Sequence, residues 1–232
     1  TFATIERSGT RCSGIGGISV VEKKPFRDHT GSKVRQLPAG TVTFLFTDIE
    51  GSTRLWETHA DAMRAALARH DALLERAISA AAGYIFKRGG DSFCAVFTRA
   101  ADALMAALAA QRALHAECWP ADVPIKVRMA LHAGAAQLRD GDYFGTPLNR
   151  VARLMAAAHG GQTLVSDEAY DACKDELPRD VRLKLLGVHT LKGVPERTAV
   201  FQLCHPDLQE SFPALAGSAI DDAQSIAVLP FV

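Results

Sequence analysis

The chain has 232 residues, 48% of them hydrophobic, and its 26 basic side chains balance 26 acidic ones. This length suits one sizeable globular domain with extensions, and the neutral balance gives no support for binding to nucleic acid or to a membrane surface. No apolar run approaches the roughly 18 residues of a membrane span, and no signal segment opens the chain. The five cysteines are scattered and never form a Cys-x-x-Cys pair, which favours a reducing, cytoplasmic location.

Composition divides the chain into three parts. Residues 1–38 are polar, contain glycine and proline, and show no sustained periodicity, so we expect an N-terminal extension. The globular domain is expected over 39–204. Residues 205–232 are interpreted as a linker followed by the start of a truncated further region, because the apolar run 225–232 ends abruptly. The first residue, Thr1, indicates a fragment.

The stretch 41–53 begins as a buried strand and ends as the start of a helix. Asp48 lies at the strand exit, followed by Gly51, Ser52 and Thr53. A carboxylate at this place suits a metal ion, and the free N–H groups of the small residues suit phosphate oxygens. The alternative is that Asp48 is only a turn or helix-cap residue.

The remaining patterns alternate between helices and strands. In chain order they predict a helix over 55–82, strands over 84–87 and 92–97 joined by a tight turn, a helix over 100–118, a strand over 125–132, a polar excursion over 137–143, a helix over 146–159, a strand over 163–165, a short helix over 167–173, and strands over 181–186 and 198–203 flanking a loop at 191–195. This order indicates a two-layer α+β domain of the ferredoxin-like type with a mainly antiparallel sheet.

A second carboxylate, Asp91, lies at the tip of the hairpin 84–97. Gly89 and Gly90 allow a tight turn and a close approach of a ligand to the backbone, although an ordinary Gly–Asp turn explains the same residues. In a ferredoxin-like sheet the opening strand and this hairpin are neighbours. Asp48 and Asp91 would then form a two-metal platform for phosphoryl chemistry, with Mg²⁺ preferred over zinc because no His or Cys occupies a comparable strand end.

Five further polar residues suit a nucleotide. Lys87 and Asp142 provide a donor and an acceptor for the edge of a purine base. Asn149 and Arg153 are four apart on a helix and project from one face, where they suit a sugar and a charged phosphate. Lys192 is a cation on a loop beside a glycine. Taken singly, each of these is more often a solvated surface residue.

Together these residues resemble the catalytic domain of class III nucleotide cyclases, in particular a bacterial subgroup with a shortened arm, over about 37–203. The matching motifs, in the family's order, are Phe46-Thr47-Asp48-Ile49-Glu50-Gly51-Ser52-Thr53, Lys87-Arg88-Gly89-Gly90-Asp91, Asp142-Tyr143-Phe144-Gly145, Asn149-Arg150-Val151-Ala152-Arg153 and Leu191-Lys192-Gly193. The resemblance implies a cyclase fold and the formation of 3′,5′-cyclic AMP and pyrophosphate from ATP.

The resemblance also implies a metal site. Asp48 and Asp91 would bind two Mg²⁺ or Mn²⁺ ions per site, with the Ile49 carbonyl as a further ligand. In this family the metal-binding pair comes from one protomer and the other contacts come from its partner, so a homodimer with two equivalent sites is expected.

The remaining roles are implied in the same way. Lys87 and Asp142 would select adenine, Asn149 would orient the ribose, and Arg153 would stabilise the transition state. Lys192 would bind the terminal phosphates.

The sequence departs from the family pattern in three places. The shortened arm leaves Arg139 as only a candidate for an additional phosphate-binding arginine, Thr146-Pro147 replaces the commoner residues after Gly145, and the regulatory region whose opening the run 225–232 resembles is absent here. Three alternatives stay open: a guanylate cyclase, a diguanylate cyclase, whose signature turn resembles 88–93, and a nucleotide-binding regulatory domain of low activity.

Overall fold

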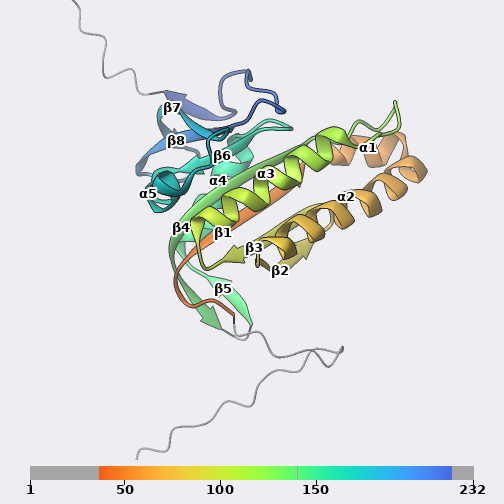
Figure 1. Ribbon diagram of the computed structural model, residues 1–232. Coiled ribbons are helices and arrows are strands. Elements are labelled where there is room, and N and C mark those ends of the chain that lie inside the picture. The colour runs from red at the N-terminus through yellow and green to blue at the C-terminus, as the bar shows by residue number, and fades with distance from the viewer. Residues whose placement is uncertain (1–36, 140, 221–232) are drawn as a thin grey trace, which may run out of the picture. The chain divides into compact units, whose positions relative to one another are not determined.

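The computed structural model describes residues 37–139 and 141–220. The proposed extension 1–38, apart from its last two residues, and the apolar run 225–232 lie outside the described residues. Within the described part, nine strands form one sheet with the order β2-β3-β1-β4-β6-β8-β7-β9, and β5 pairs with β4 outside this order (Figure 1). All described pairings are antiparallel except the one between β4 and β6.

The elements alternate much as the sequence predicts. The strands are β1 (Gly40–Ile49), β2 (Tyr84–Gly89), β3 (Ser92–Phe97), β4 (Val127–Arg139), β5 (Asp142–Phe144), β6 (Thr163–Ser166), β7 (Arg182–Leu191), β8 (Arg197–Cys204) and β9 (Ser218–Ile220). The helices are α1 (Ser52–Thr58), α2 (Ala60–Ala80), α3 (Ala100–Ala116), α4 (Thr146–Ala157) and α5 (Asp167–Cys173), followed by a short 3₁₀ helix, η1 (Lys174–Glu176).

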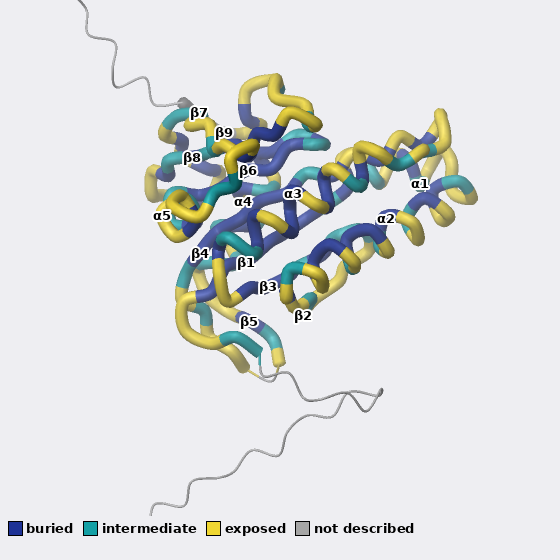
Figure 2. Tube along the Cα trace, viewed as in Figure 1, coloured by how far each residue is buried: buried dark blue, intermediate teal, exposed yellow. Residues whose placement is uncertain are grey.

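Strand β1 is buried on both faces, which explains its nearly uncharged sequence. Successive side chains alternate between the faces. Phe44 and Phe46 belong to an apolar cluster with α4, whereas Leu45 and Ile49 belong to a larger cluster with α2 and α3. Buried and exposed positions alternate along α2 and α3 (Figure 2). The expected mixed α+β fold with a mainly antiparallel sheet is confirmed, and α4 adds helical cover to the second face.

The helix expected over 55–82 is two helices, so that prediction is wrong in its continuity. The backbone of His59 leaves the helical region, with φ −141° and ψ 49°. Its N–H bonds the carbonyl of Leu55 at 2.8 Å and closes α1, while its own carbonyl accepts from Met63 at 2.8 Å and opens α2. Because Leu55 and Met63 are both buried, the break lets the apolar faces of α1 and α2 each turn toward the core.

Gly83 follows this helical region at a point where no larger residue fits. A Cβ built there would lie 2.4 Å from the ring of Phe97 and 2.8 Å from a methyl group of Ile78. The N–H of Gly83 bonds the carbonyl of Ile78 at 2.9 Å. The glycine therefore allows the chain to pass close over the sheet on its way into β2.

The polar excursion expected over 137–143 is a hairpin rather than a loop. Strand β4 continues to Arg139 and returns as β5, with Gln137 opposite Phe144 and Arg139 opposite Asp142. The hairpin projects beyond the other strands in Figure 1. The sequence did not predict this strand pair, because most of its side chains are exposed rather than half-buried and so show no regular alternation of apolar and polar residues.

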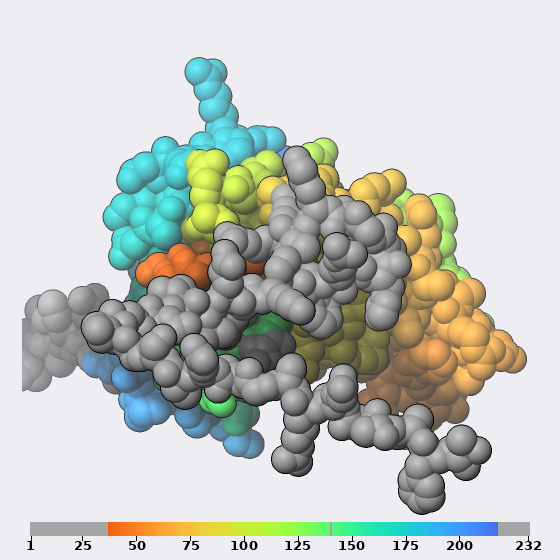
Figure 3. All heavy atoms as spheres, turned by 90° about the horizontal axis from the view of Figure 1, so that it is seen from below, coloured from red at the N-terminus to blue at the C-terminus, as the bar shows by residue number. Residues whose placement is uncertain are grey.

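The described part of the expected linker packs onto the domain. Leu215 is buried in the α4-side cluster, the N–H of Ala216 bonds the carbonyl of Ala157 at 3.0 Å, and the rings of His159 and Phe212 are stacked. Strand β9 then pairs with the end of β7. In Figure 3 the orange residues of α1 and α2 and the blue residues near the C-terminal end lie on opposite sides. No helix among the described residues is long and apolar enough to cross a membrane.

Candidate active site

The two aspartates predicted to share metal ions lie side by side. The register of β1 and β3 places Thr47 opposite Phe93, so Asp48 lies next to Ser92 at the strand ends. The hydroxyl of Ser92 donates to Oδ1 of Asp48 at 2.8 Å, and the N–H of Ile49 donates to Oδ2 of Asp91 at 3.1 Å. Each aspartate thus accepts a hydrogen bond from the residue that directly follows the other aspartate in the sequence.

The structure adds Arg128, which sequence reasoning did not single out. Its Nε lies 2.9 Å from Oδ2 of Asp48, and β1–β4 pairing places the two residues directly opposite each other. Alternation along β4 indicated that one face is polar, but only the register shows which carboxylate the guanidinium meets. Both side chains are half-buried, so this ion pair is partly shielded from solvent.

The donors at this point suit a hard divalent cation. Two carboxylates and the Ile49 carbonyl provide only oxygen, and Mg²⁺ is commonly held by one or two carboxylates together with substrate phosphates. Within the described residues no cluster of three or more His, Cys, Asp or Glu side chains could form a closed metal site. The residues therefore fit an ion that is completed by its nucleotide.

The turn after β1 leaves free donors. Gly51 is the N-cap residue of α1, with φ 69°, and no side chain caps the helix. Asp48 is therefore not the cap of α1, and it lies within β1 rather than in a turn, so neither form of the alternative interpretation holds. The first N–H groups of a helix have no partner within it, so those of Ser52 and Thr53 remain available close to the carboxylates.

Lys87 and Asp142 form an ion pair across β2 and β5, with Nζ 3.9 Å from Oδ2. Both side chains are partly exposed. Oδ1 of Asp142 also accepts the N–H of Tyr143 at 2.8 Å, which fixes the carboxylate. The long separation leaves room for each group to take a hydrogen-bonding partner of its own.

An aromatic cluster supports this pair. The rings of Phe86 and Tyr143 meet edge to face with centroids 5.0 Å apart, and Phe44 contacts Tyr143 at 5.4 Å. The Tyr143 hydroxyl donates to the carbonyl of Pro38 at 2.6 Å, and burial raises its pKa to about 12. Burial also raises the pKa of the neighbouring Cys94 thiol to about 11, so that thiol stays protonated at neutral pH.

The third group is on α4 and the loop after β7. Asn149 and Arg153 line one cavity of about 300 Å³ together with Ala152 and Gly193. Arg153 and Lys192 line an adjoining cavity of about 210 Å³, whose wall includes Ala216 and Gly217. The predicted helical spacing thus brings the amide and the guanidinium to one cavity.

The eleven predicted positions therefore form three groups: carboxylates with the turn after β1, the Lys87–Asp142 pair, and the α4–loop group. Within the described ranges no hydrogen bond or ion pair joins the carboxylates to Arg153 or Lys192. Arg139, the other phosphate-binding candidate, lies over the ring of Phe144 at 5.6 Å on the hairpin.

Comparison with known proteins identifies the family of the chain. A family model described as the adenylate and guanylate cyclase catalytic domain matches residues 34–204. An uncharacterized protein of Mycobacterium tuberculosis is 44% identical over 180 residues, which cover 77% of this chain and 61% of that protein. The chain therefore spans about three fifths of that relative's length.

Two further matches are named as cyclases. An adenylate cyclase of Podospora anserina is 30% identical over 195 residues, which cover 72% of this chain and 9% of that protein. A solved structure of an adenylate cyclase from Trypanosoma brucei in its monomeric state has a TM-score of 0.70 and 26% identity, covering 78% of this chain and 94% of that one.

Proposed function

Because the chain belongs to the family of adenylate and guanylate cyclase catalytic domains, we propose that it converts ATP to 3′,5′-cyclic AMP and pyrophosphate. The observation that carries the choice of ATP is the Lys87–Asp142 pair. Adenine presents an amino donor beside a ring-nitrogen acceptor, which match a carboxylate and an ammonium group. Guanine presents a carbonyl acceptor where adenine has its amino group, and this acceptor would face the carboxylate unfavourably.

Asp48, Asp91 and the Ile49 carbonyl would hold two Mg²⁺ or Mn²⁺ ions. When bound, such ions lower the pKa of the ribose 3′-hydroxyl and neutralise charge on the triphosphate. The free N–H groups of Gly51, Ser52 and Thr53 add donors for phosphate oxygens.

The other residues act on the substrate directly. Asn149 orients the ribose so that its 3′-oxygen points in line at the α-phosphorus. Arg153 faces the charge that develops on the transferred phosphoryl group, and Lys192 holds the departing pyrophosphate. These three residues border adjoining cavities, which supports their action on one substrate.

The site is proposed to be shared by two copies of the chain. Support comes from the absence, among the described residues, of any hydrogen bond or ion pair between the carboxylates and the α4–loop group, since a metal-bound triphosphate has to meet both. In a homodimer, the carboxylates of one protomer would face Arg153 and Lys192 of the other.

A product assay with ATP and GTP in parallel, in the presence of Mn²⁺, tests the function. Cyclic AMP is the expected product, and Asp91→Ala should abolish it. Product at the wild-type rate from an Asp91→Ala dimer that binds ATP and metal would refute the mechanism. Cyclic GMP alone would favour a guanylate cyclase, GTP consumption with a dinucleotide product a diguanylate cyclase, and tight ATP binding without turnover a regulatory module.

A further inference from the structure

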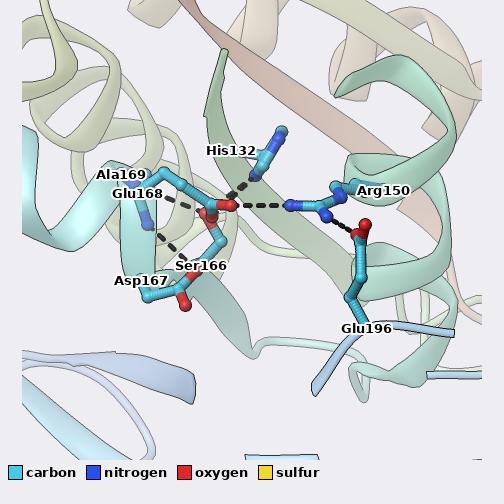
Figure 4. Close-up of polar contacts among 7 residues, drawn as sticks. All are labelled: His132, Arg150, Ser166, Asp167, Glu168, Ala169 and Glu196. Atoms are coloured by element: carbon cyan, nitrogen blue, oxygen red, sulfur yellow. Dashed lines mark hydrogen bonds and ion pairs between the residues drawn. The ribbon is translucent and has the colours of Figure 1, made fainter. Parts of the chain in front are cut away.

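One arginine outside the predicted site joins three elements. Nη1 of Arg150, on α4, donates to Oε1 of Glu168 at 2.7 Å, and its Nη2 pairs with Oε2 of Glu196. Glu168 belongs to the first turn of α5, and Glu196 lies in the loop between β7 and β8. Figure 4 shows the guanidinium between the two carboxylates, so a single side chain connects α4, α5 and this loop.

The inner end of this bridge is fixed. Nδ1 of His132, a buried residue of β4, lies 3.3 Å from Oε2 of Glu168 and 2.9 Å from the hydroxyl of Ser166. That hydroxyl also accepts the N–H of Ala169 and caps α5 (Figure 4). Glu168 therefore lies against His132 of the sheet and is part of the capped first turn of α5, so its place does not depend on Arg150 alone.

The outer end is different. The side chain of Glu196 is 62% exposed and belongs to the loop that carries Lys192. Among the described residues, β9 pairs with Leu191 at the start of this loop. Within the loop, the N–H of Val194 bonds the carbonyl of Leu191 at 3.0 Å, and Val194 is buried. Gly193 passes close to Arg153, since a Cβ built there would lie 3.7 Å from the guanidinium.

Arg150 therefore connects the residues that the reaction must align. It follows Asn149 directly on α4 and precedes Arg153 by three residues, while its outer carboxylate lies four residues beyond Lys192. An exposed ion pair contributes little to folding stability. Its effect on a loop with few other contacts is instead to restrict the conformations from which Lys192 reaches a phosphate.

We propose that Arg150 is a positioning residue and that its pair with Glu196 fixes the Lys192 loop against α4. The bridge sets the distance between Lys192 and the two residues Asn149 and Arg153. These three side chains can then contact the terminal phosphates, the ribose and the transferring phosphoryl group at the same time. This inference rests on the proposed cyclase reaction.

Kinetics of Glu196→Gln test the proposal, because that variant removes only the outer, exposed end of the bridge. We expect kcat/KM to fall about five- to twentyfold, mainly through kcat, because Lys192 is misplaced as charge moves onto pyrophosphate. Glu196→Asp should recover part of the loss. Arg112→Gln, which breaks a similarly exposed pair with Asp207, is the matched control and should keep wild-type kinetics.

A double-mutant cycle separates positioning from general destabilisation. If the two side chains act through one another, Arg150→Gln combined with Glu196→Gln should be no slower than Arg150→Gln alone, within about twofold. Independent, multiplying losses would overturn the proposal, as would wild-type kinetics of Glu196→Gln.

Hydrogen exchange provides a readout that does not depend on turnover. In the nucleotide-free protein, Glu196→Gln should speed exchange of the amides at 192–196, Val194 above all, and leave β4 and β6 unchanged. Unchanged loop exchange would refute the bridge even if the enzyme is active. Faster exchange in a chain whose wild type forms no cyclic nucleotide would refute the proposed function and leave the structural bridge supported.

Discussion

Asp48 has two competing cationic partners. In the structure its Oδ2 is bound by Arg128, whereas the proposed function requires the same carboxylate for a divalent ion. The arginine pairs with this half-buried carboxylate, which reduces the cost of partly desolvating its charge. If the proposed function is correct, metal binding at this point would exchange one cation for another rather than simply add one.

Arg128→Gln should consequently tighten Mn²⁺ binding to the nucleotide-free protein by about tenfold. Removing a cation a few ångströms away changes the electrostatic free energy by about 1 kcal/mol or more. Electron paramagnetic resonance of free Mn²⁺ measures the affinity, and Arg64→Gln, which removes an equal charge from the surface of α2, is the control. Equal affinities for wild type and Arg128→Gln would show that the arginine does not compete.

Asp167 and Glu168 are neighbours with opposite responses to pH. Burial and the adjacent Glu168 raise the pKa of Asp167 to about 6. Burial also acts to raise the pKa of Glu168, but hydrogen bonds from His132 and Asp167 lower it overall. A carboxyl group with a raised folded-state pKa opposes folding once it ionises, whereas one with a lowered pKa supports folding above its unfolded-state pKa.

Asp167→Asn should therefore stabilise the protein above pH 6, with a gain in Tm of roughly 2 °C. The gain should shrink as pH falls and vanish below about pH 4, where Asp167 is protonated in both folded and unfolded states. Calorimetry from pH 4 to pH 8 measures the difference. Glu168→Gln should instead lower Tm at neutral pH, and a shift of the same sign in both variants would contradict the assignment.

At the scale of elements, the passage from α2 to β2 depends on the absence of a side chain at Gly83. Gly83→Ala should lower the free energy of unfolding by about 1–3 kcal/mol, because the added methyl group overlaps the Phe97 ring and the surrounding core is closely packed. Denaturant unfolding measures this cost. Gly89→Ala is the control, since a methyl group there meets no atom within 4 Å; an equal loss in both variants would indicate a backbone effect instead.

Elements with a regular apolar period were predictable. β1, α3 and α4 follow from alternation or helical spacing, and the proximity of Asp48 to Asp91 follows from the topology of the predicted sheet. The break at His59 was not predictable, because no glycine or proline marks it and the burial of Leu55 and Met63 decides it. Arg128 was missed for a similar reason: its pairing depends on strand register, which is set by contacts between distant segments.

At the scale of the whole molecule, the proposed shared site makes a prediction about mixtures. Asp48→Ala removes a metal ligand and Arg153→Ala removes a transition-state contact, so each variant alone should be inactive. Mixed dimers should regain part of the wild-type activity, because one of their two sites carries neither substitution. Cyclic AMP formation after mixing the two variants measures this recovery, and no recovery in demonstrated mixed dimers would rule out a site built from two chains.

The last described residues have a mechanical consequence. The amide of Ala216 is bonded to the end of α4, and Ser218, two residues later, is paired with Leu191, the residue before Lys192. These two backbone contacts connect the helix that carries Arg153 to the strand that leads into Lys192. Loss of this connection would let the two supports move apart, and the proposed reaction would then slow although every reactive side chain is still present.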